Sequence, residues 1–243
     1  MSTDATTKDG EENDNGWTTI LGLGSLLSEE SSRTTFPDLC NFRLGRVPHY
    51  RRVFGHSPAV FYRRGTANPA TLEVSSLSAE YVGPDFPGFV CTVFEVPSGI
   101  LMEDGVPGEA YREREEEFDI QSVPYVDGSD GSVDGGNADV SFKSKTGILC
   151  VKWTDEEYVA YWGQERFEEK YTSAGIPTIW GWTKDSGLRP CRPYFRLCLN
   201  AAKGMGEQCY NSFLDETFLV DRTTTVRKYL EQYPEVIEDD DQV

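Results

Sequence analysis

Residues 17–26 read Trp-Thr-Thr-Ile-Leu-Gly-Leu-Gly-Ser-Leu, and this stretch decides how the fold begins. Its first half is aromatic, β-branched or aliphatic, which predicts a short buried strand. The loop Gly22-Leu23-Gly24-Ser25-Leu26 follows at once. Glycine in such a loop lets the backbone approach a ligand closely and lets successive N–H groups point at an anion. A plain turn at the end of the strand is the alternative, and this stretch alone leaves both open.

Three known glycine-containing motifs do not fit this loop. It lacks the Lys-Ser/Thr ending of a phosphate-binding P-loop, and it lacks the third glycine of a dinucleotide fingerprint. It is not the nucleophile elbow of hydrolases, because Leu27 stands where the final glycine should be. The loop therefore predicts none of these three chemistries.

Outward from this loop, the chain changes from strand-like to helix-like patterns. Strands are predicted where β-branched and aromatic residues gather, at residues 51–54, 59–62, 73–79, 89–96, 118–126 and 148–153. Helices are predicted at residues 155–171, 194–202, 206–214 and 224–233. A β-rich first part followed by a helical last third predicts an α+β protein built on a small barrel or a strongly bent sheet.

A single domain is expected over residues 17–233, with its helical part beginning at about residue 154. Residues 1–16 and 234–243 are expected to be acidic tails, the first of them disordered. The run 127–137 is rich in Asp, Gly and Ser and is expected to be a flexible insertion.

The charge of the chain lies mainly at its edges. The net charge is −18, of which residues 1–16 carry −4, residues 231–243 carry −6 and residues 127–139 carry −4. About −4 is left for the packed body. This distribution argues against a nucleic-acid partner and says little about an active site.

Composition also narrows the location and the metal chemistry. No apolar stretch approaches the roughly 18–20 residues of a membrane helix, and the start of the chain lacks a secretory signal. A cytoplasmic protein without a membrane partner is therefore expected. The six cysteines contain no CxxC pair and are expected to be free thiols, and two histidines exclude a His-rich metal centre. The oligomeric state is left open.

Glu115 is the candidate catalytic residue. On a helix that begins near Tyr111, Glu115 falls on the same face as Tyr111 and Phe118, whereas the other three glutamates of the run 113–117 fall on the opposite half. A carboxylate between two aromatic rings loses hydration, which raises its pKa and suits it to accept a proton near neutrality. The alternative is a surface helix whose charges form only i,i+4 pairs, such as Arg112 with Glu116.

Other groups of candidate site residues predict a function less specifically. No motif surrounds Cys40, His49 and His56, so a Cys–His nucleophile is not predicted. The pair Trp180 and Trp182 fits either a pocket wall or core packing. The turn Arg63-Arg64-Gly65-Thr66 fits either a substrate carboxylate or a solvated turn.

Together these pieces resemble the gamma-glutamylcyclotransferase superfamily, in particular its ChaC-like branch. Leu23-Gly24-Ser25-Leu26 is similar to the Tyr-Gly-Ser-Leu loop of the family, and Arg51-Arg52-Val53-Phe54 to its paired-arginine strand. Arg64-Gly65-Thr66 matches the end of a His-Arg-Gly-Thr turn, and Arg114-Glu115 matches the end of its Tyr-Leu-x-x-Arg-Glu helix motif. The resemblance covers residues 17–126, and the C-terminal segments look like an uncharacterised plant and algal subgroup.

The resemblance implies a fold and a reaction. The fold is a small bent mixed β-sheet or barrel with packed helices and a helical C-terminal extension. The reaction, classed as lyase or transferase chemistry, cyclises a γ-glutamyl amide or peptide to 5-oxoproline and releases an amine, without cofactor or metal. Glu115 would be the acid–base residue, and Leu23, Gly24, Ser25, Leu26 and Arg64 would bind the small-molecule substrate.

Departures from the family pattern leave other functions open. Leu23 replaces the loop tyrosine, and Glu116-Glu117 replace the Gly-Gly that follows the family glutamate. One alternative is a non-catalytic protein that binds small anions or a protein partner on the same fold. Another is a related enzyme that uses Glu115 on a different acyl donor. Glutathione is therefore not established as the substrate.

Overall fold

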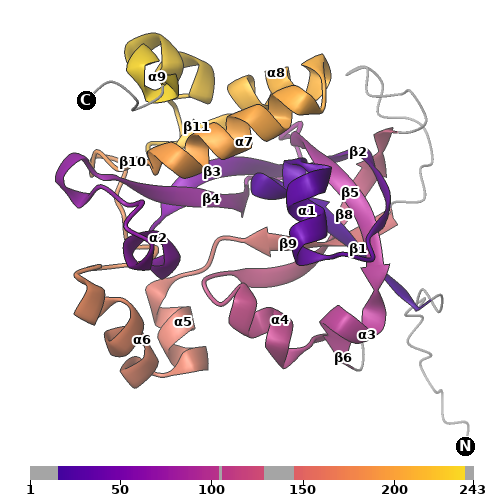
Figure 1. Cartoon of the computed structure of the whole chain (residues 1–243), viewed down its shortest axis with the longest axis horizontal. Coiled ribbons are helices and arrows are strands. Elements are labelled where there is room, and N and C mark those ends of the chain that lie inside the picture. Colours follow the sequence, from indigo (N-terminus) through magenta and orange to yellow (C-terminus); the bar gives the residue numbers. More distant parts are fainter. Residues whose placement is uncertain (1–15, 104–105, 129–144, 239–243) are drawn as a thin grey trace, which may run out of the picture.

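The computed structural model describes residues 16–103, 106–128 and 145–238, and within these ranges five strands close into a barrel (Figure 1). The strands are β1 (Trp17–Gly22), β5 (Phe89–Pro97), β2 (Cys40–Val47), β8 (Asp119–Asp127) and β9 (Lys145–Val151), in this order around the ring. Neighbours pair antiparallel, and a parallel bridge between Ile20 and Ile148 closes the ring. The α+β class and the small barrel predicted from the sequence are confirmed.

The sheet continues beyond the barrel. Strand β4 (Glu73–Tyr81) pairs with β9, then β3 (Tyr50–His56) pairs with β4, and the short β11 (Thr217–Leu219) pairs with β3. A further two-residue strand, β10 (Arg189–Pro190), pairs with β4. Almost every residue of β4 and β5 is buried, because these strands are covered on both faces.

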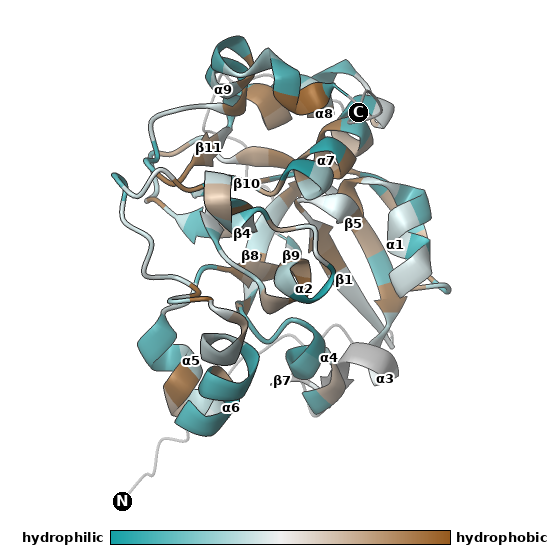
Figure 2. Cartoon of the chain, turned by 60° about the vertical axis from the view of Figure 1, so that its left-hand side comes forward, coloured by the Kyte–Doolittle hydropathy of each residue, from teal (hydrophilic) through white to brown (hydrophobic). Residues whose placement is uncertain are grey.

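Three C-terminal helices cover this extended part of the sheet. Helices α7 (Arg192–Gly204), α8 (Glu207–Asp215) and α9 (Val226–Gln232) lie together on one side of it (Figure 1). The apolar faces of α7 and α8 pack into the main core with the barrel strands. Figure 2 shows hydrophobic residues along the barrel strands and on α8, and mostly hydrophilic residues on α1 (Glu29–Thr35) and α4 (Glu109–Arg114).

The remaining helices lie around the other end of the barrel. Helices α5 (Asp155–Trp162) and α6 (Gln164–Lys170) build a satellite core around Tyr158, Tyr171 and Trp180. Helix α2 (Ala59–Arg63) contributes Ala59 to the same cluster. A short helix, α3 (Ser98–Leu101), and a two-stranded ribbon of β6 (Met102–Glu103) and β7 (Val106–Pro107) precede α4.

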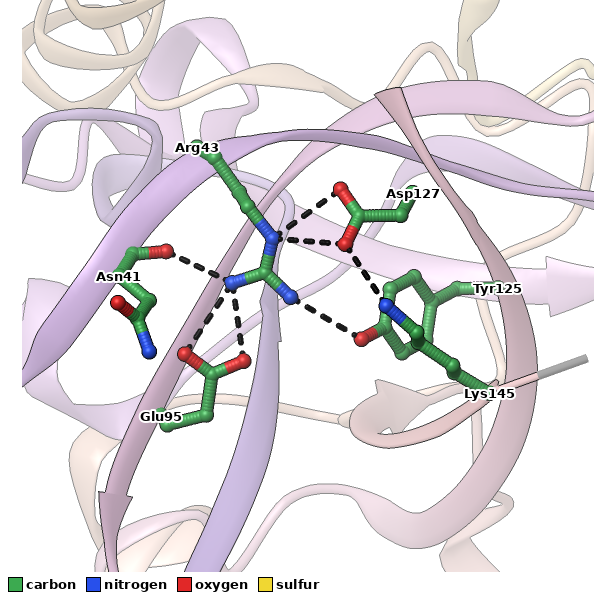
Figure 3. A network of polar contacts seen from close by, with 6 residues as sticks. All are labelled: Asn41, Arg43, Glu95, Tyr125, Asp127 and Lys145. Atoms are coloured by element: carbon green, nitrogen blue, oxygen red, sulfur yellow. Dashed lines mark hydrogen bonds and ion pairs between the residues drawn. The ribbon is translucent and has the colours of Figure 1, made fainter. Parts of the chain in front are cut away.

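An ion-pair network on the barrel wall joins β2, β5, β8 and β9 (Figure 3). Arg43 Nε donates to the two oxygens of Asp127 at 3.1 and 3.0 Å, and its Nη1 lies 2.9 Å from Glu95 Oε1. Arg43 Nη2 donates to Tyr125 Oη at 3.2 Å, and Lys145 Nζ lies 3.1 Å from Asp127 Oδ2. Since the carboxylates are only 10% and 17% exposed, the Arg43 guanidinium links β2, β5 and β8 in a partly dehydrated setting, and Lys145 adds β9 through Asp127.

Most predicted strands and helices are present, whereas the short elements α3, β6, β7, β10 and β11 were not predicted. Three further differences concern helices. Residues 59–62 form helix α2 and not a strand, so that prediction was wrong; Pro58 in an extended conformation caps this helix at its start. The helix expected at 155–171 breaks at Gly163, whose φ is 91°. Helix α1 was missed although Ser28 caps it through a hydrogen bond from Ser31 N.

The expected tails and insertion lie largely outside the described residues. This holds for residues 1–15, 129–144 and 239–243. The packed body extends beyond residue 233, however, because Pro234–Ile237 form a 3-10 turn that buries Val236 in the main core. No helix in the described ranges combines the length and apolar character needed to cross a bilayer.

Candidate functional site

A cavity of about 230 Å³ lies where the loop after β1, the end of β3, the turn after α4 and helix α7 meet. Its lining includes Leu23, Gly24, Ser25, Leu26, Glu115, Glu117, His56 and Tyr194. The cavity thus brings the two sequence-predicted features, the glycine loop and Glu115, to one place. Apolar side chains such as Phe61 and Leu77 complete its wall.

The glycine loop leaves β1 and turns into a single 3-10 turn, Ser25–Leu27. Thr92 of β5 holds the loop by donating its hydroxyl to Leu26 O at 2.7 Å. A helical turn leaves its first N–H groups without an intrahelical partner, and the described residues supply none for the amides of Ser25 and Leu26. These amides are therefore available to an anionic group in the cavity.

Gly24 is required by the approach of Tyr194 from helix α7. A Cβ atom at position 24 would fall inside the contact distance of the Tyr194 hydroxyl, and Tyr194 Cζ would lie 3.5 Å away. The Tyr194 hydroxyl therefore reaches the loop backbone at the edge of the cavity. The sequence motif has Leu23 where the family loop has a tyrosine, and here a phenol enters from a different element.

Glu115 directly follows Arg114, the last residue of helix α4, and its side chain is partly buried. Its side chain is 19% exposed; Oε1 accepts from Arg114 Nε at 3.0 Å, and the Cys150 thiol points at Oε2 from 3.8 Å. Burial raises the pKa of Glu115 above its ordinary value, and the neighbouring Arg114 opposes this shift. Arg114 is itself fixed by a 2.9 Å hydrogen bond to Thr35 of helix α1.

The helical wheel predicted that Glu113, Glu116 and Glu117 face water, and for two of them this was wrong. Glu113 is exposed, but Glu116 and Glu117 are only 5% and 9% exposed. The helix ends at Arg114 and the chain turns at residues 115–117, so the 100° spacing no longer applies. A period read from sequence cannot locate the point where a helix ends without a capping signal.

Two indoles fix the backbone of this turn. Trp162 Nε1 donates to Glu116 O at 3.1 Å, and Trp180 Nε1 donates to Glu117 O at 2.8 Å. Trp180 belongs to the satellite core, and Trp182 packs against another small cluster. The core-packing alternative for these tryptophans is therefore the one that the structure supports.

The two buried glutamates differ in their partners. Glu116 Oε2 accepts from Arg166 Nη2 and Lys170 Nζ, both at 2.7 Å. Glu117 has no cation beside it among the described residues; its Oε1 accepts from Tyr171 Oη at 2.9 Å. Burial, reinforced by the charge of Glu116, raises the pKa of Glu117 to about 7.

His56 closes the inner wall of the cavity. The ring is fully buried, stacks on Trp180 at 4.4 Å between centroids and meets Phe118 edge-on at 4.9 Å. Burial lowers the pKa of His56 to about 3, so the imidazole is neutral. Neither ring nitrogen has a hydrogen-bond partner among the described residues.

The structure does not bring Arg64 to this site. Arg64 follows the last residue of helix α2, is exposed, and is not part of the cavity wall. The paired arginines of strand β3, Arg51 and Arg52, are bound to other parts of the sheet. Arg51 pairs with Glu80 at 3.1 Å, and the fully buried Arg52 donates to Val90 O at 3.2 Å. Arg51 and Arg52 therefore serve strand packing outside the cavity.

Sequence reasoning missed three wall residues of the cavity: Glu117, His56 and Tyr194. His56 ends a strand and Tyr194 sits at the start of a helix, with no motif around either. Only the departure from the family's Gly-Gly pointed at Glu117. All six cysteines are free, as expected from their spacing.

Among the described residues, no group of three or more His, Cys, Asp or Glu side chains is arranged to hold a metal ion. No protein-family model and no curated protein matches the chain.

Solved structures show a distant likeness. The crystal structure of an uncharacterised human protein aligns with a TM-score of 0.39 and 15% sequence identity, covering 57% of this chain and 68% of that chain. A gamma-glutamyl cyclotransferase aligns with a TM-score of 0.38 and 13% identity, covering 56% of this chain and 67% of that chain. At this distance the geometry of the cavity has to carry the functional argument.

Proposed function

We propose that this protein cyclises a γ-glutamyl amide or peptide to 5-oxoproline and releases the amine, with Glu115 as general acid and base. The observation that carries the proposal is the shared cavity, in which Glu115 lies together with the glycine loop Leu23–Leu26. A carboxyl group with a raised pKa and a set of backbone N–H donors are what this reaction needs from a protein.

Substrate binding uses the loop. The amides of Ser25 and Leu26 hold the substrate's α-carboxylate, and the Tyr194 hydroxyl at Gly24 adds a neutral donor beside them. The cavity of about 230 Å³ is smaller than the roughly 300–1,000 Å³ of pockets for drug-sized ligands. We therefore propose a substrate with a small leaving amine.

Catalysis is intramolecular. Glu115 takes a proton from the substrate's α-ammonium, and the resulting amine attacks the γ-carbonyl carbon of the same molecule. Glu115 returns its proton to the leaving nitrogen as the bond from that carbon to this nitrogen breaks. It then takes the extra proton of the ring nitrogen, which leaves the neutral lactam, and passes this proton to the released amine. Because both reacting groups belong to one molecule, positioning them supplies much of the rate.

The ChaC-like branch and glutathione are finer parts of this proposal. The loop and Glu115 support the general reaction, whereas Arg64, the family's arginine turn, lies away from the cavity. Glutathione is thus one substrate to be tested among other γ-glutamyl compounds.

A binding protein without turnover is the second candidate. The Arg114–Glu115 ion pair favours it, because a cation 3.0 Å from the carboxylate stabilises the charged form and weakens it as a base. Such a protein would bind γ-glutamyl compounds in the same cavity and release no 5-oxoproline.

The test is a panel of γ-glutamyl amides and peptides, glutathione included, with 5-oxoproline measured by mass spectrometry. We expect release by the wild type and a loss of about 10²-fold or more in Glu115→Gln. Glu113→Gln, an exposed glutamate on the same helix, is the matched control and should keep full activity. Binding without release from any compound would favour the second candidate, and equal activity of the two variants would remove Glu115 from the mechanism.

A further inference from the structure

The cavity contains a second carboxyl group that the proposed mechanism does not use. Glu117 lines the same cavity as Glu115, and the two residues belong to one turn of the chain. Glu117 is 9% exposed and has no cationic partner among the described residues. An unpaired carboxylate is costly to bury, so a group in this setting favours its protonated form.

The contacts of Glu117 leave one of its oxygens for a ligand. Oε1 accepts the Tyr171 hydrogen bond at 2.9 Å, while Oε2 has no partner in the described part of the chain. Oε2 is also not one of the buried side-chain atoms that lack a partner, so it is not sealed from solvent. The Trp180 bond to Glu117 O holds the backbone, so the carboxyl is presented from a rigid turn.

Glu117 shares the cavity wall with apolar side chains, with the Arg114–Glu115 pair and with a neutral ring. His56 lines the cavity as an uncharged imidazole with both nitrogens unpartnered in the described residues. Both nitrogens are sealed from solvent, so Glu117 and not His56 presents an acid–base group to this part of the cavity.

We propose that Glu117 is a second acid–base residue, giving its carboxyl proton to the leaving amine while Glu115 takes the proton of the attacking amine. This inference rests on the proposed function and deepens it. Two carboxyl groups whose surroundings differ divide the acid and base roles between them. The family pattern has glycine at this position, so the second carboxyl is a property of this chain.

The proton balance closes over one turnover. Glu115 carboxylate takes a proton from the α-ammonium, and the amine nitrogen bonds to the γ-carbonyl carbon. Glu117 then protonates the leaving nitrogen as its bond to that carbon breaks, and the amine departs. The ring nitrogen still carries one proton too many, and it returns this proton to Glu117 as the lactam forms. Glu115 gives its own proton to the released amine.

Several groups around Glu117 decide at which pH it titrates. Glu115 and Glu116 on the same turn disfavour its charged form, and Tyr171 favours it through a hydrogen bond. From the packed helices, Tyr158 of α5 stays uncharged, since burial raises its pKa, and Arg166 and Lys170 of α6 are engaged by Glu116.

The first experiment compares two leaving groups in Glu117→Gln. A γ-glutamyl alkylamide needs its leaving nitrogen protonated, whereas a γ-glutamyl anilide has a weakly basic nitrogen that leaves with less proton transfer. We expect Glu117→Gln to lower kcat about 10²-fold on the alkylamide and less than about 10-fold on the anilide. A purely structural role would lower both rates equally, and that result overturns the inference.

The pH profile of the wild type gives a second test that needs no variant. Since Glu117 must be protonated, kcat on the alkylamide should fall as the pH rises through about 7, and Glu117→Gln should lose this falling limb. A wild-type rate that stays flat there also overturns the inference.

The two proposals fail in different ways. Activity that depends on Glu115 but not on Glu117 removes only the second acid. No turnover of any substrate by the wild type removes both.

Discussion

The burial of Glu117 predicts an unusual dependence of stability on pH. In the unfolded chain Glu117 ionises from about its ordinary pKa of 4.5, whereas in the folded protein its pKa is about 7. Between these values the folded state holds a proton that the unfolded state has lost. The contribution of Glu117 is therefore fully present below pH 4.5 and is lost as the pH rises through about 7.

The magnitude follows from the two pKa values. A shift from 4.5 to about 7 corresponds to at most about 3.5 kcal/mol, at about 1.4 kcal/mol per unit. Glu117→Gln removes the charge and keeps an oxygen for the Tyr171 hydroxyl. We therefore expect the variant to gain stability over the wild type as the pH rises, by up to about 3.5 kcal/mol at about pH 8.

Thermal unfolding of both proteins between pH 4.5 and about pH 8 measures this difference. For a chain of this size, 1 kcal/mol moves Tm by about 2–4 °C, so the gap should open by several degrees. Titration of carboxylates that do not interact with Glu117 is common to both proteins and cancels, whereas Glu115 and Glu116 are coupled to it and belong to the measured difference. Glu113→Gln is the control, because its exposed side chain should give a small and pH-independent change. A Tm gap between Glu117→Gln and wild type that is constant with pH would refute the reasoning.

Two further predictions test the cavity and the barrel. Gly24→Ala should cost about 1–3 kcal/mol and raise KM, because the new methyl group meets the Tyr194 hydroxyl. Adding Tyr194→Phe should recover most of that stability in denaturant unfolding, and strictly additive effects would contradict the contact. Arg43→Ala should destabilise the protein by about 2 kcal/mol, because Asp127 and Glu95 lose a charge-assisted partner in a partly buried network. The exposed Arg33–Glu29 pair is the control, and Arg33→Ala should cost less than about 1 kcal/mol in the same unfolding assay.

Local patterns foretold much of this fold. The alternation in residues 73–79 and 89–96 predicted strands that the structure contains as β4 and β5. The tendency to form a strand depends on side chains that alternate along the chain, so the sequence displays it directly. Residues 59–62 were predicted wrongly because a short apolar run fits a strand and a helix equally. In the structure a helix begins directly after Pro58.

The candidate site was predicted in part. The glycine loop and Glu115 were identified from their own neighbours in sequence, and both line the cavity. The exposure of Glu116 and Glu117 was mispredicted because the helix ends at Arg114. The turn that follows is held by hydrogen bonds from two indoles that are distant in sequence. The residues near Glu116 and Glu117 in sequence cannot predict a hydrogen bond from a tryptophan that lies far along the chain.

The sequence by itself therefore determined most of the longer elements, the α+β class and two of the groups that face the cavity, since these depend on residue type and spacing. The tertiary structure alone decided what surrounds them. It placed Tyr194 against Gly24 and Arg64 outside the cavity wall. It also buried Glu117 with no counter-charge from the described residues, in the cavity that neutral His56 lines. The physical reason is that dehydration and charge pairing are set by residues that meet only when the barrel and its helices have packed.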